Sequence, residues 1–231
     1  MRRLAALSHR LRARSLCKHG AEPPAGGLAY WEWRARRHGA LAVLHLGHAE
    51  RELGSVTRAQ ADRILPVLRA RLHGDERLAL DFGCGSGRFT GLLAAAIGGR
   101  ALGVDPVAAL LELAPAEPPA EFQLLREGRI PLDDAAADVV FVCLVLGGIT
   151  DDTELAATAA EIARVLHPRG LLLLVENTAA RADPPHWRYR SAARYAALFP
   201  GIGLESAGGY QDLGEPIEIL AGRRSEAGDA R

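Results

Sequence analysis

A five-residue apolar run followed by three alternating glycines is the feature that most constrains the fold of this chain. The run is Leu78–Phe82, the glycines are Gly83, Gly85 and Gly87, and a second apolar segment begins at Phe89. This pattern predicts a buried strand, a tight turn and a helix. Glycine lets a backbone turn sharply and approach a ligand closely. The N–H groups at a helix start bind anionic groups, so the segment predicts a ligand-binding loop.

The segments after this unit repeat the alternation of strand and helix. Strands are predicted over 101–104, 122–125, 138–146 and 171–175, and helices over 89–97, 107–113 and 152–166. Alternation of this kind implies a parallel sheet with right-handed crossovers. A helix at 190–199 and a strand hairpin near 203–210 and 216–221 follow, and the hairpin is expected to add one antiparallel strand. We therefore predict a doubly wound, Rossmann-like α/β domain with a mostly parallel sheet and helices on both faces.

The overall composition disfavours several classes of protein. The chain has 28 basic and 28 acidic residues, so its net charge of zero argues against nucleic acid held by charge alone. No apolar run reaches the ~20 residues of a membrane span. Three widely spaced cysteines predict neither a disulfide framework nor a zinc knot, and they fit a reducing cytosol. We therefore expect a soluble cytoplasmic protein.

Two acids frame the glycine loop and indicate its ligand. Asp105 follows Gly83 by 22 residues and ends the second predicted strand, the spacing at which a carboxylate accepts hydrogen bonds from both hydroxyls of a ribose. Asp81 precedes the glycines and suits a ligand with an ammonium group, such as the methionyl part of S-adenosylmethionine. The dinucleotide fingerprint has a third glycine where this chain has Arg88. The pattern therefore favours S-adenosylmethionine over a nicotinamide dinucleotide.

The stretch from Leu78 to Val175 resembles the class I S-adenosylmethionine-dependent methyltransferases, with five motifs in the order of that family. The motifs are residues 81–87, 103–106, 127–132, 137–146 and 161–174. Residues 30–35 also resemble an N-terminal segment of many members that act on small molecules. The resemblance implies seven strands and methyl transfer from S-adenosylmethionine to an oxygen or nitrogen of a small-molecule acceptor.

The resemblance also implies which residues bind the cofactor. They are Asp81, Gly83, Gly85, Gly87, Asp105, Pro106, Glu127, Gly128 and Cys143. No metal is implied, because His45 and His48 are spaced for a metal but lack a third ligand nearby. The alternatives are an RNA or protein methyltransferase, a non-catalytic cofactor-binding relative and, least favoured, a nicotinamide oxidoreductase. Neither a membrane nor nucleic acid is an expected partner.

Four segments are expected along the chain. They are a basic flexible arm over 1–27, a helical cap over 28–74, the methyltransferase domain over 75–222 and a disordered tail over 223–231. Thr57 is the expected N-cap of a helix with apolar residues at 64, 65, 68 and 72. Tyr30, Trp31 and Trp33 either form an aromatic lid over the site or only dock the cap on the domain.

The acceptor side of the site has weaker signals. Many relatives have a histidine pair after the fourth strand, where this chain has Gly147 and Gly148, and we expect these glycines to leave room for a bulky acceptor. His186 follows the fifth strand in a proline-rich loop and is the candidate catalytic base. Its alternative is a surface loop residue. Glu176 and Asn177 either contact the acceptor or hydrogen-bond loop backbone.

Overall fold

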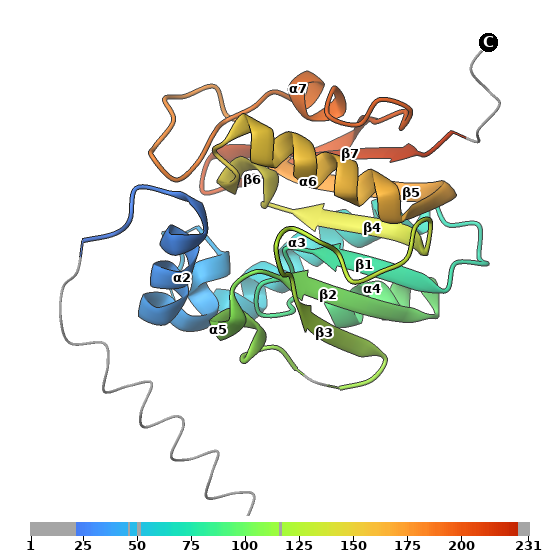
Figure 1. Ribbon diagram of the computed structural model, residues 1–231, viewed down its shortest axis with the longest axis horizontal. Coiled ribbons are helices and arrows are strands. Elements are labelled where there is room, and N and C mark those ends of the chain that lie inside the picture. The colour runs from blue at the N-terminus through green and yellow to red at the C-terminus, as the bar shows by residue number, and fades with distance from the viewer. Residues whose placement is uncertain (1–21, 46, 50–51, 116, 226–231) are drawn as a thin grey trace, which may run out of the picture.

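The computed structural model describes residues 22–45, 47–49, 52–115 and 117–225. Its centre is a seven-stranded sheet with the strand order β3-β2-β1-β4-β5-β7-β6 (Figure 1). The strands are β1 (Leu78–Phe82), β2 (Arg100–Asp105), β3 (Ala120–Leu124), β4 (Ala137–Cys143), β5 (Leu166–Asn177), β6 (Glu205–Asp212) and β7 (Glu215–Arg223). The first five strands pair in parallel, and β7 pairs antiparallel with both β5 and β6. The predicted seven-stranded, mostly parallel sheet is therefore confirmed.

The helices connect these strands and cover them. The helical segments are α2 (Gly27–His38), η1 (Gly39–Val43), α3 (Leu53–Arg69), α4 (Thr90–Ile97), α5 (Ala108–Leu111), η3 (Leu146–Gly148), α6 (Asp152–Val165) and α7 (Ala192–Ala196). Each predicted strand and helix of the 78–175 stretch is present, with ends displaced by a few residues. None of the helices in the described part of the chain is long and apolar enough to cross a membrane.

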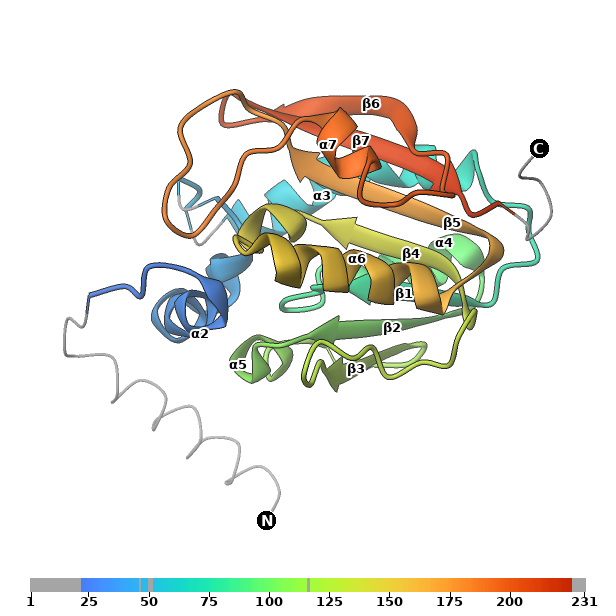
Figure 2. The ribbon, with the colours of Figure 1, turned by 45° about the horizontal axis from the view of Figure 1, so that its top comes forward.

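The sheet has an apolar cluster on each face, because side chains of a strand alternate between its two sides. One cluster joins Leu80 and Val140 to α6 and α7, and the other joins Ala79 and Phe141 to α3 and α4. Figure 2 shows α6 in front of the sheet and α4 behind it. Helices therefore cover both faces, as the sequence predicted, and the continuous apolar runs of β4 and β5 reflect burial on both sides.

Several local boundaries differ from those predicted. Thr57 lies inside α3, where its hydroxyl donates to the carbonyl of Leu53, so it is not an N-cap. The N-cap of α6 is Asp151, whose carboxylate accepts from the N–H of Glu154 at 2.8 Å. Strand β5 begins directly after α6, so Pro168 lies within this strand instead of separating the two elements. Strand β5 is paired with β4 from its first residue, and this contact between distant segments determines where the strand begins.

The predicted segments also need adjustment. Helix α3, assigned to the cap, packs its buried Ile64 and Leu68 on the sheet and belongs to the core. Strand β7 extends to Arg223, and Arg224 pairs with Ile202, so the ordered chain continues past the predicted boundary at 222. Residues 1–21 of the predicted arm and 226–231 of the predicted tail lie outside the described residues.

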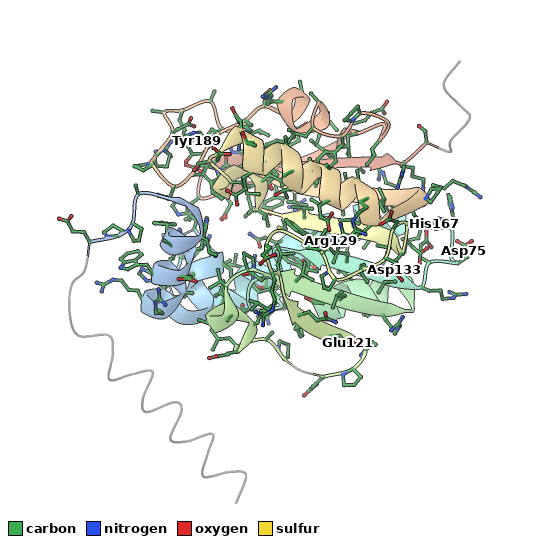
Figure 3. All side chains as sticks on the ribbon, viewed as in Figure 1. Asp75, Glu121, Arg129, Asp133, His167 and Tyr189 are labelled. Atoms are coloured by element: carbon green, nitrogen blue, oxygen red, sulfur yellow. The ribbon has the colours of Figure 1, made fainter. Side chains whose placement is uncertain are left out.

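The parallel strands end at one edge of the sheet, and this edge positions the site. Helix α2 lies beyond the carboxyl ends of β2 and β4 (Figure 1). Tyr189 lies at the same end of the molecule, whereas Asp75 and His167 lie at the opposite end (Figure 3). Ligands of open α/β sheets bind at the carboxyl ends of the strands, so a ligand site is expected at this edge.

Candidate functional site

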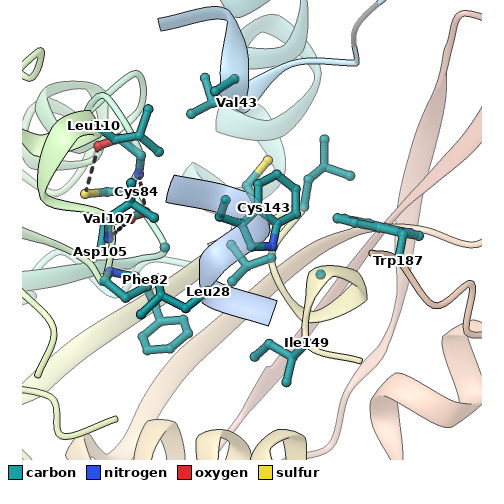
Figure 4. A pocket seen from close by; sticks show the side chains of 18 of the residues that line it. Leu28, Val43, Phe82, Cys84, Asp105, Val107, Leu110, Cys143, Ile149 and Trp187 are labelled. Carbon is teal, nitrogen blue, oxygen red and sulfur yellow. Dashed lines mark hydrogen bonds between the residues drawn. The ribbon is translucent and has the colours of Figure 1, made fainter. Parts of the chain in front are cut away.

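A cavity of about 860 Å³ lies at the carboxyl edge of the parallel strands. Its walls come from α2 and η1, the glycine loop after β1, the ends of β2, β4 and β5, the loop over 184–189 and the turn between β6 and β7. Figure 4 shows Val43, Asp105, Cys143 and Trp187 around it. Among the residues predicted from sequence, those lining the cavity are Asp81, Gly83, Gly85, Asp105, Pro106, Glu127, Gly128, Cys143 and His186.

The glycine loop depends on left-handed backbone and on close contacts. The φ angles of Gly83 and Gly85 are 70° and 57°, a region that side chains with a Cβ disfavour. A Cβ at Gly83 would lie 2.4 Å from Val145, and one at Gly85 would lie 2.4 Å from Val43. The second contact shows that η1 sits directly on the loop, so the cap helps to form the cavity wall.

Gly87 differs from the other two glycines. It does not belong to the cavity lining, and a Cβ there would lie 2.7 Å from the ring of Phe122 on β3. Its φ of 74° also favours glycine. Gly87 therefore allows the loop to pack on the neighbouring strand, and its predicted part in cofactor binding stays a prediction.

Asp105 shapes the floor of the cavity with both of its oxygens. One accepts from the N–H of Gly85 and the other from the N–H of Val107, each at 2.8 Å. Burial raises the pKa of this carboxyl to about 6, and the two hydrogen bonds oppose that rise. Each carboxylate oxygen can accept further hydrogen bonds, so Asp105 holds the loop and still offers acceptors to the cavity.

Asp81 is a buried acid with only 3% of its surface exposed. The hydroxyl of Thr90, the first residue of α4, donates to it at 2.6 Å. Burial raises its pKa to about 7, although Thr90 and the charge of Arg88 favour the ionised form. No cationic group among the described residues lies within salt-bridge distance of Asp81, so the carboxylate is available to a cationic ligand.

Glu176 at the end of β5 organises the turn that follows β4. Its carboxylate accepts from the N–H groups of Val145, Leu146 and Gly147 at 2.9, 2.8 and 3.4 Å. Burial raises its pKa to about 7, and the three N–H groups and Arg190 oppose this. Of the two roles considered from sequence, hydrogen bonding to loop backbone is the one that the structure shows.

The space beside Gly147 and Gly148 is filled by tryptophans. A Cβ at Gly147 would lie 2.2 Å from the ring of Trp187, and one at Gly148 would lie 2.8 Å from the ring of Trp31. The two indoles meet edge to face with centroids 6.3 Å apart. The expectation that these glycines leave room for an acceptor was wrong, because they accommodate two rings of the cavity wall.

His186 lines the cavity and stacks on a ring of the cap. Its imidazole lies 4.1 Å from the ring of Tyr30, with an angle of 14° between the planes. Burial and the nearby charge of Arg34 lower its pKa below the usual value, so the imidazole is neutral at pH 7. Together with Trp31 and Trp187, the stack joins the cap to the loop after β5, which supports the aromatic-lid interpretation of the N-terminal segment.

The two histidines considered as metal ligands have other partners. His48 contacts the carboxylate of Asp212 at 2.7 Å, and His45 accepts from the N–H of Gly47. Within the described residues, three side chains of types that can bind a metal lie close together, those of His73, Asp75 and Glu76. That cluster lies at the opposite end of the sheet from the cavity (Figure 3), and Glu76 there already accepts from two backbone N–H groups and Arg223.

Several cavity residues were missed from sequence. Val43, Arg34, Asp212 and Glu215 line the cavity, yet they lie far along the chain from the glycine loop. Arg34 and Val43 belong to the cap, and the two acids flank the turn of the last hairpin. Arg34 lies in the N-terminal segment 30–35 that resembles the family, whereas no local motif marks the other three, since their place in the site depends on how the cap and the hairpin pack on the sheet.

Comparisons with known proteins agree with this geometry. Residues 80–174 match a family model described as a methyltransferase domain. The chain is 34% identical over 134 residues to an uncharacterized methyltransferase of Mycobacterium tuberculosis, covering 58% of this chain and 50% of that protein. It is 30% identical over 169 residues to a trans-aconitate 2-methyltransferase of Methylobacterium radiotolerans, covering 71% of this chain and 63% of the relative. The chain thus spans half to two thirds of the length of these relatives.

A solved structure has a similar fold. The magnesium protoporphyrin IX methyltransferase of Synechocystis, determined with bound S-adenosylhomocysteine, superposes with a TM-score of 0.62 at 17% identity, covering 84% of this chain and 93% of that one. Residues 80–174 thus belong to the methyltransferase domain family, and the fold around them is similar to that of a methyltransferase solved with S-adenosylhomocysteine.

Gly85→Ala should weaken binding of S-adenosylhomocysteine at least tenfold, because the added Cβ meets Val43 and strains the left-handed backbone. The double variant with Val43→Ala should recover part of the affinity. Gly91→Ala on α4 has open space at its Cβ and serves as the control. Isothermal titration gives the affinities and a melting curve reports the fold. Unchanged affinity in Gly85→Ala would contradict this placement of the loop.

Proposed function

We propose that this chain transfers the methyl group of S-adenosylmethionine to an oxygen or nitrogen of a small-molecule acceptor, using a doubly wound α/β domain. The observation that carries the proposal is one cavity that brings together Asp81, the glycine loop and Asp105 and continues over β4 and β5. The named relatives that act on trans-aconitate and on a porphyrin support a small-molecule acceptor.

The residues present fit this cofactor. Asp81 is a buried carboxylate without a cationic partner in the described chain and suits the ammonium group. Asp105 has acceptor capacity left for ribose hydroxyls, and Gly83 and Gly85 let the ligand approach the backbone. We assign Pro106, Glu127, Gly128 and Cys143 to the same ligand because they line the cavity. When bound, the cofactor supplies a methyl group on a sulfonium, which is already an activated leaving group.

The protein's own contribution is alignment and exclusion of water. The turn over 145–147 is held by Glu176, and the tryptophans at 31 and 187 close the wall above it. Fixing donor and acceptor in one geometry accounts for most of the acceleration expected of such a site. We propose that neutral His186 accepts the proton of an acceptor hydroxyl or amine, because it lines the same cavity.

The purified chain is expected to bind S-adenosylmethionine and S-adenosylhomocysteine but not NAD, since Arg88 replaces the third glycine of a dinucleotide site. Isothermal titration with the three ligands tests binding. Transfer of a labelled methyl group into pools of small metabolites and of RNA then tests the acceptor class. Binding of NAD without binding of either sulfonium-derived ligand would refute the proposal, and label in RNA alone would refute the small-molecule acceptor.

Affinity for S-adenosylhomocysteine should fall as the pH is lowered from 8 to 6. The pKa of Asp81 in the free protein is about 7, so below that pH the carboxyl must lose a proton before it pairs with the ammonium group. The dissociation constant should rise by about tenfold per pH unit below 7. Titrations in buffers of different ionisation enthalpy should show the proton released on binding.

Asp81→Asn is the matched control for this pH dependence, because it keeps the shape and removes the charge. This variant should bind more weakly at pH 8 and show a flat pH profile between 8 and 7, above the pKa of about 6 of Asp105. Glu176 also has a pKa of about 7, so a profile that persists between pH 8 and 7 in Asp81→Asn would assign the titration to Glu176 and contradict the role given to Asp81.

His186→Phe should lower turnover on the identified acceptor by about 10²–10⁴-fold and leave the affinity for S-adenosylhomocysteine within twofold. Phenylalanine keeps the stack on Tyr30 but accepts no proton. His186→Ala removes both the stack and the base, so a loss shared equally by both variants points to proton transfer. Full turnover in His186→Phe with a loss in His186→Ala would instead assign His186 to the lid.

A further inference from the structure

The cavity contains two arginines without a carboxylate partner. Arg34 and Arg88 line it, and among the described residues neither has an acidic group within salt-bridge distance. Taking a guanidinium out of water without a counter-ion is costly. Arginine binds carboxylate and phosphate groups through several N–H donors at once. Two such cations in one ligand cavity indicate two anionic ligand groups.

Arg34 lies in the cap beside the glycine loop, and its charge also acts on His186. Its guanidinium donates to the hydroxyl of Tyr30 at 3.3 Å and to the carbonyl of Leu44, so it joins α2 to the end of η1. Val43, the preceding residue, sits on Gly85 of the glycine loop. The cation is 7% exposed and its Nε has no hydrogen-bond partner in the described structure. It is thus placed beside the loop where the cofactor binds.

Arg88 has charged and polar neighbours on several elements. It follows the glycine loop, and the groups that act on its charge are Cys143 at the end of β4, Tyr210 and Asp212 of β6, and Asp81. In the sheet order, β6 is on the far side of β4 from the ribose-binding strand β2. The surroundings of Arg88 therefore extend from the cofactor's methionyl end toward the acceptor side.

The guanidinium of Arg88 is held in place by neutral groups. Its Nη1 donates to the hydroxyl of Thr57 at 3.1 Å and to the amide oxygen of Gln60 at 3.0 Å, both on α3. Its carbon lies 5.0 Å from the ring centre of Phe89. None of the hydrogen bonds found in the described structure uses Nη2 or Nε of Arg88. A positioned cation with donors to spare is suited to bind a ligand.

The acidic side chains near Arg88 have other interaction partners. Asp212 pairs with His48 at 2.7 Å, and Asp81 accepts from Thr90 at 2.6 Å and is assigned to the cofactor ammonium. Neither lies within 4 Å of the guanidinium. These acids disfavour a doubly charged phosphate on the same site through like-charge repulsion, whereas a single carboxylate matches one guanidinium.

We propose that Arg88 binds a carboxylate of the methyl acceptor, so that the substrates of this enzyme are carboxylic acids. The inference rests on the proposed function, because it needs the cofactor half of the cavity to be filled by S-adenosylmethionine. S-Adenosylmethionine has a single carboxylate, which Arg34 is placed to meet. Arg88 is then the specificity-determining cation for the acceptor.

The test measures carboxylate binding to protein saturated with S-adenosylhomocysteine. Malonate, succinate and trans-aconitate are titrated into this complex, with dimethyl succinate as the uncharged probe and inorganic phosphate as the alternative anion. At least one carboxylate should bind, and the ester should not. Arg88→Gln should weaken the binding of that carboxylate about 10- to 100-fold. Arg88→Lys should weaken its binding less because lysine keeps the charge.

Two further titrations distinguish a role of Arg88 in binding the cofactor from a role in binding the acceptor. Arg88→Lys keeps the positive charge that lowers the pKa of Asp81, and it should bind S-adenosylhomocysteine and 5′-methylthioadenosine, which lacks the amino-acid part, with affinities within about twofold of the wild type. Arg63→Gln, an exposed change of the same charge on α3, should leave all titrations unchanged. Melting curves of each variant report whether the fold is intact, and Arg88→Lys provides the comparison if Arg88→Gln is unstable.

Three results would overturn the proposal. If Arg88→Lys, which keeps the charge beside Asp81, weakens binding of S-adenosylhomocysteine but not of 5′-methylthioadenosine, Arg88 binds the cofactor carboxylate instead. If phosphate binds more tightly than every carboxylate, the acceptor anion is a phosphate. If no carboxylate binds the loaded wild-type protein, or Arg88→Gln binds it equally well, the acceptor site does not use this cation. Failure of S-adenosylhomocysteine itself to bind would instead refute the proposed function.

Discussion

Two buried carboxylates hold the carboxyl edge of the sheet in the shape on which the rest of the site depends. Asp105 accepts from N–H groups of the turns after β1 and β2, and Glu176 accepts from three N–H groups of the turn after β4. Turns at a buried edge leave N–H groups that need acceptors. These side chains provide them, so that loops from three strands stay in register around one cavity.

The burial of this edge explains why the site contains acids with raised pKa values. Asp81, Asp105 and Glu176 are all at most 5% exposed, and burial disfavours their charged forms. Backbone and hydroxyl donors compensate Asp105 and Glu176 more fully than Asp81, which has the single donor Thr90. A carboxyl group whose pKa is near 7 and that has no cationic partner in the described chain is suited to pair with a cationic ligand group. The other two carboxylates hold the loops through hydrogen bonds.

Sequence reasoning was most successful where a local pattern and a physical need coincide. The strand, the left-handed glycines at 83 and 85 and the acid at the end of β2 are adjacent in the chain or at fixed spacing, and the structure brings them into one cavity. It was wrong where the meaning of a residue depends on a distant neighbour. Gly147 and Gly148 were taken as space for an acceptor, but Trp187 and Trp31 fill that space.

The sequence by itself determined the class of fold, the alternation that makes the sheet parallel and the loop that receives the cofactor, because hydrophobic period and glycine placement act over a few residues. Only the tertiary structure decided that α3 belongs to the core, that Val43 covers Gly85 and that Arg88 and Asp212 line the same cavity. These arrangements join segments separated by tens of residues or more. Their energies come from packing and charge between distant elements, which no local pattern records.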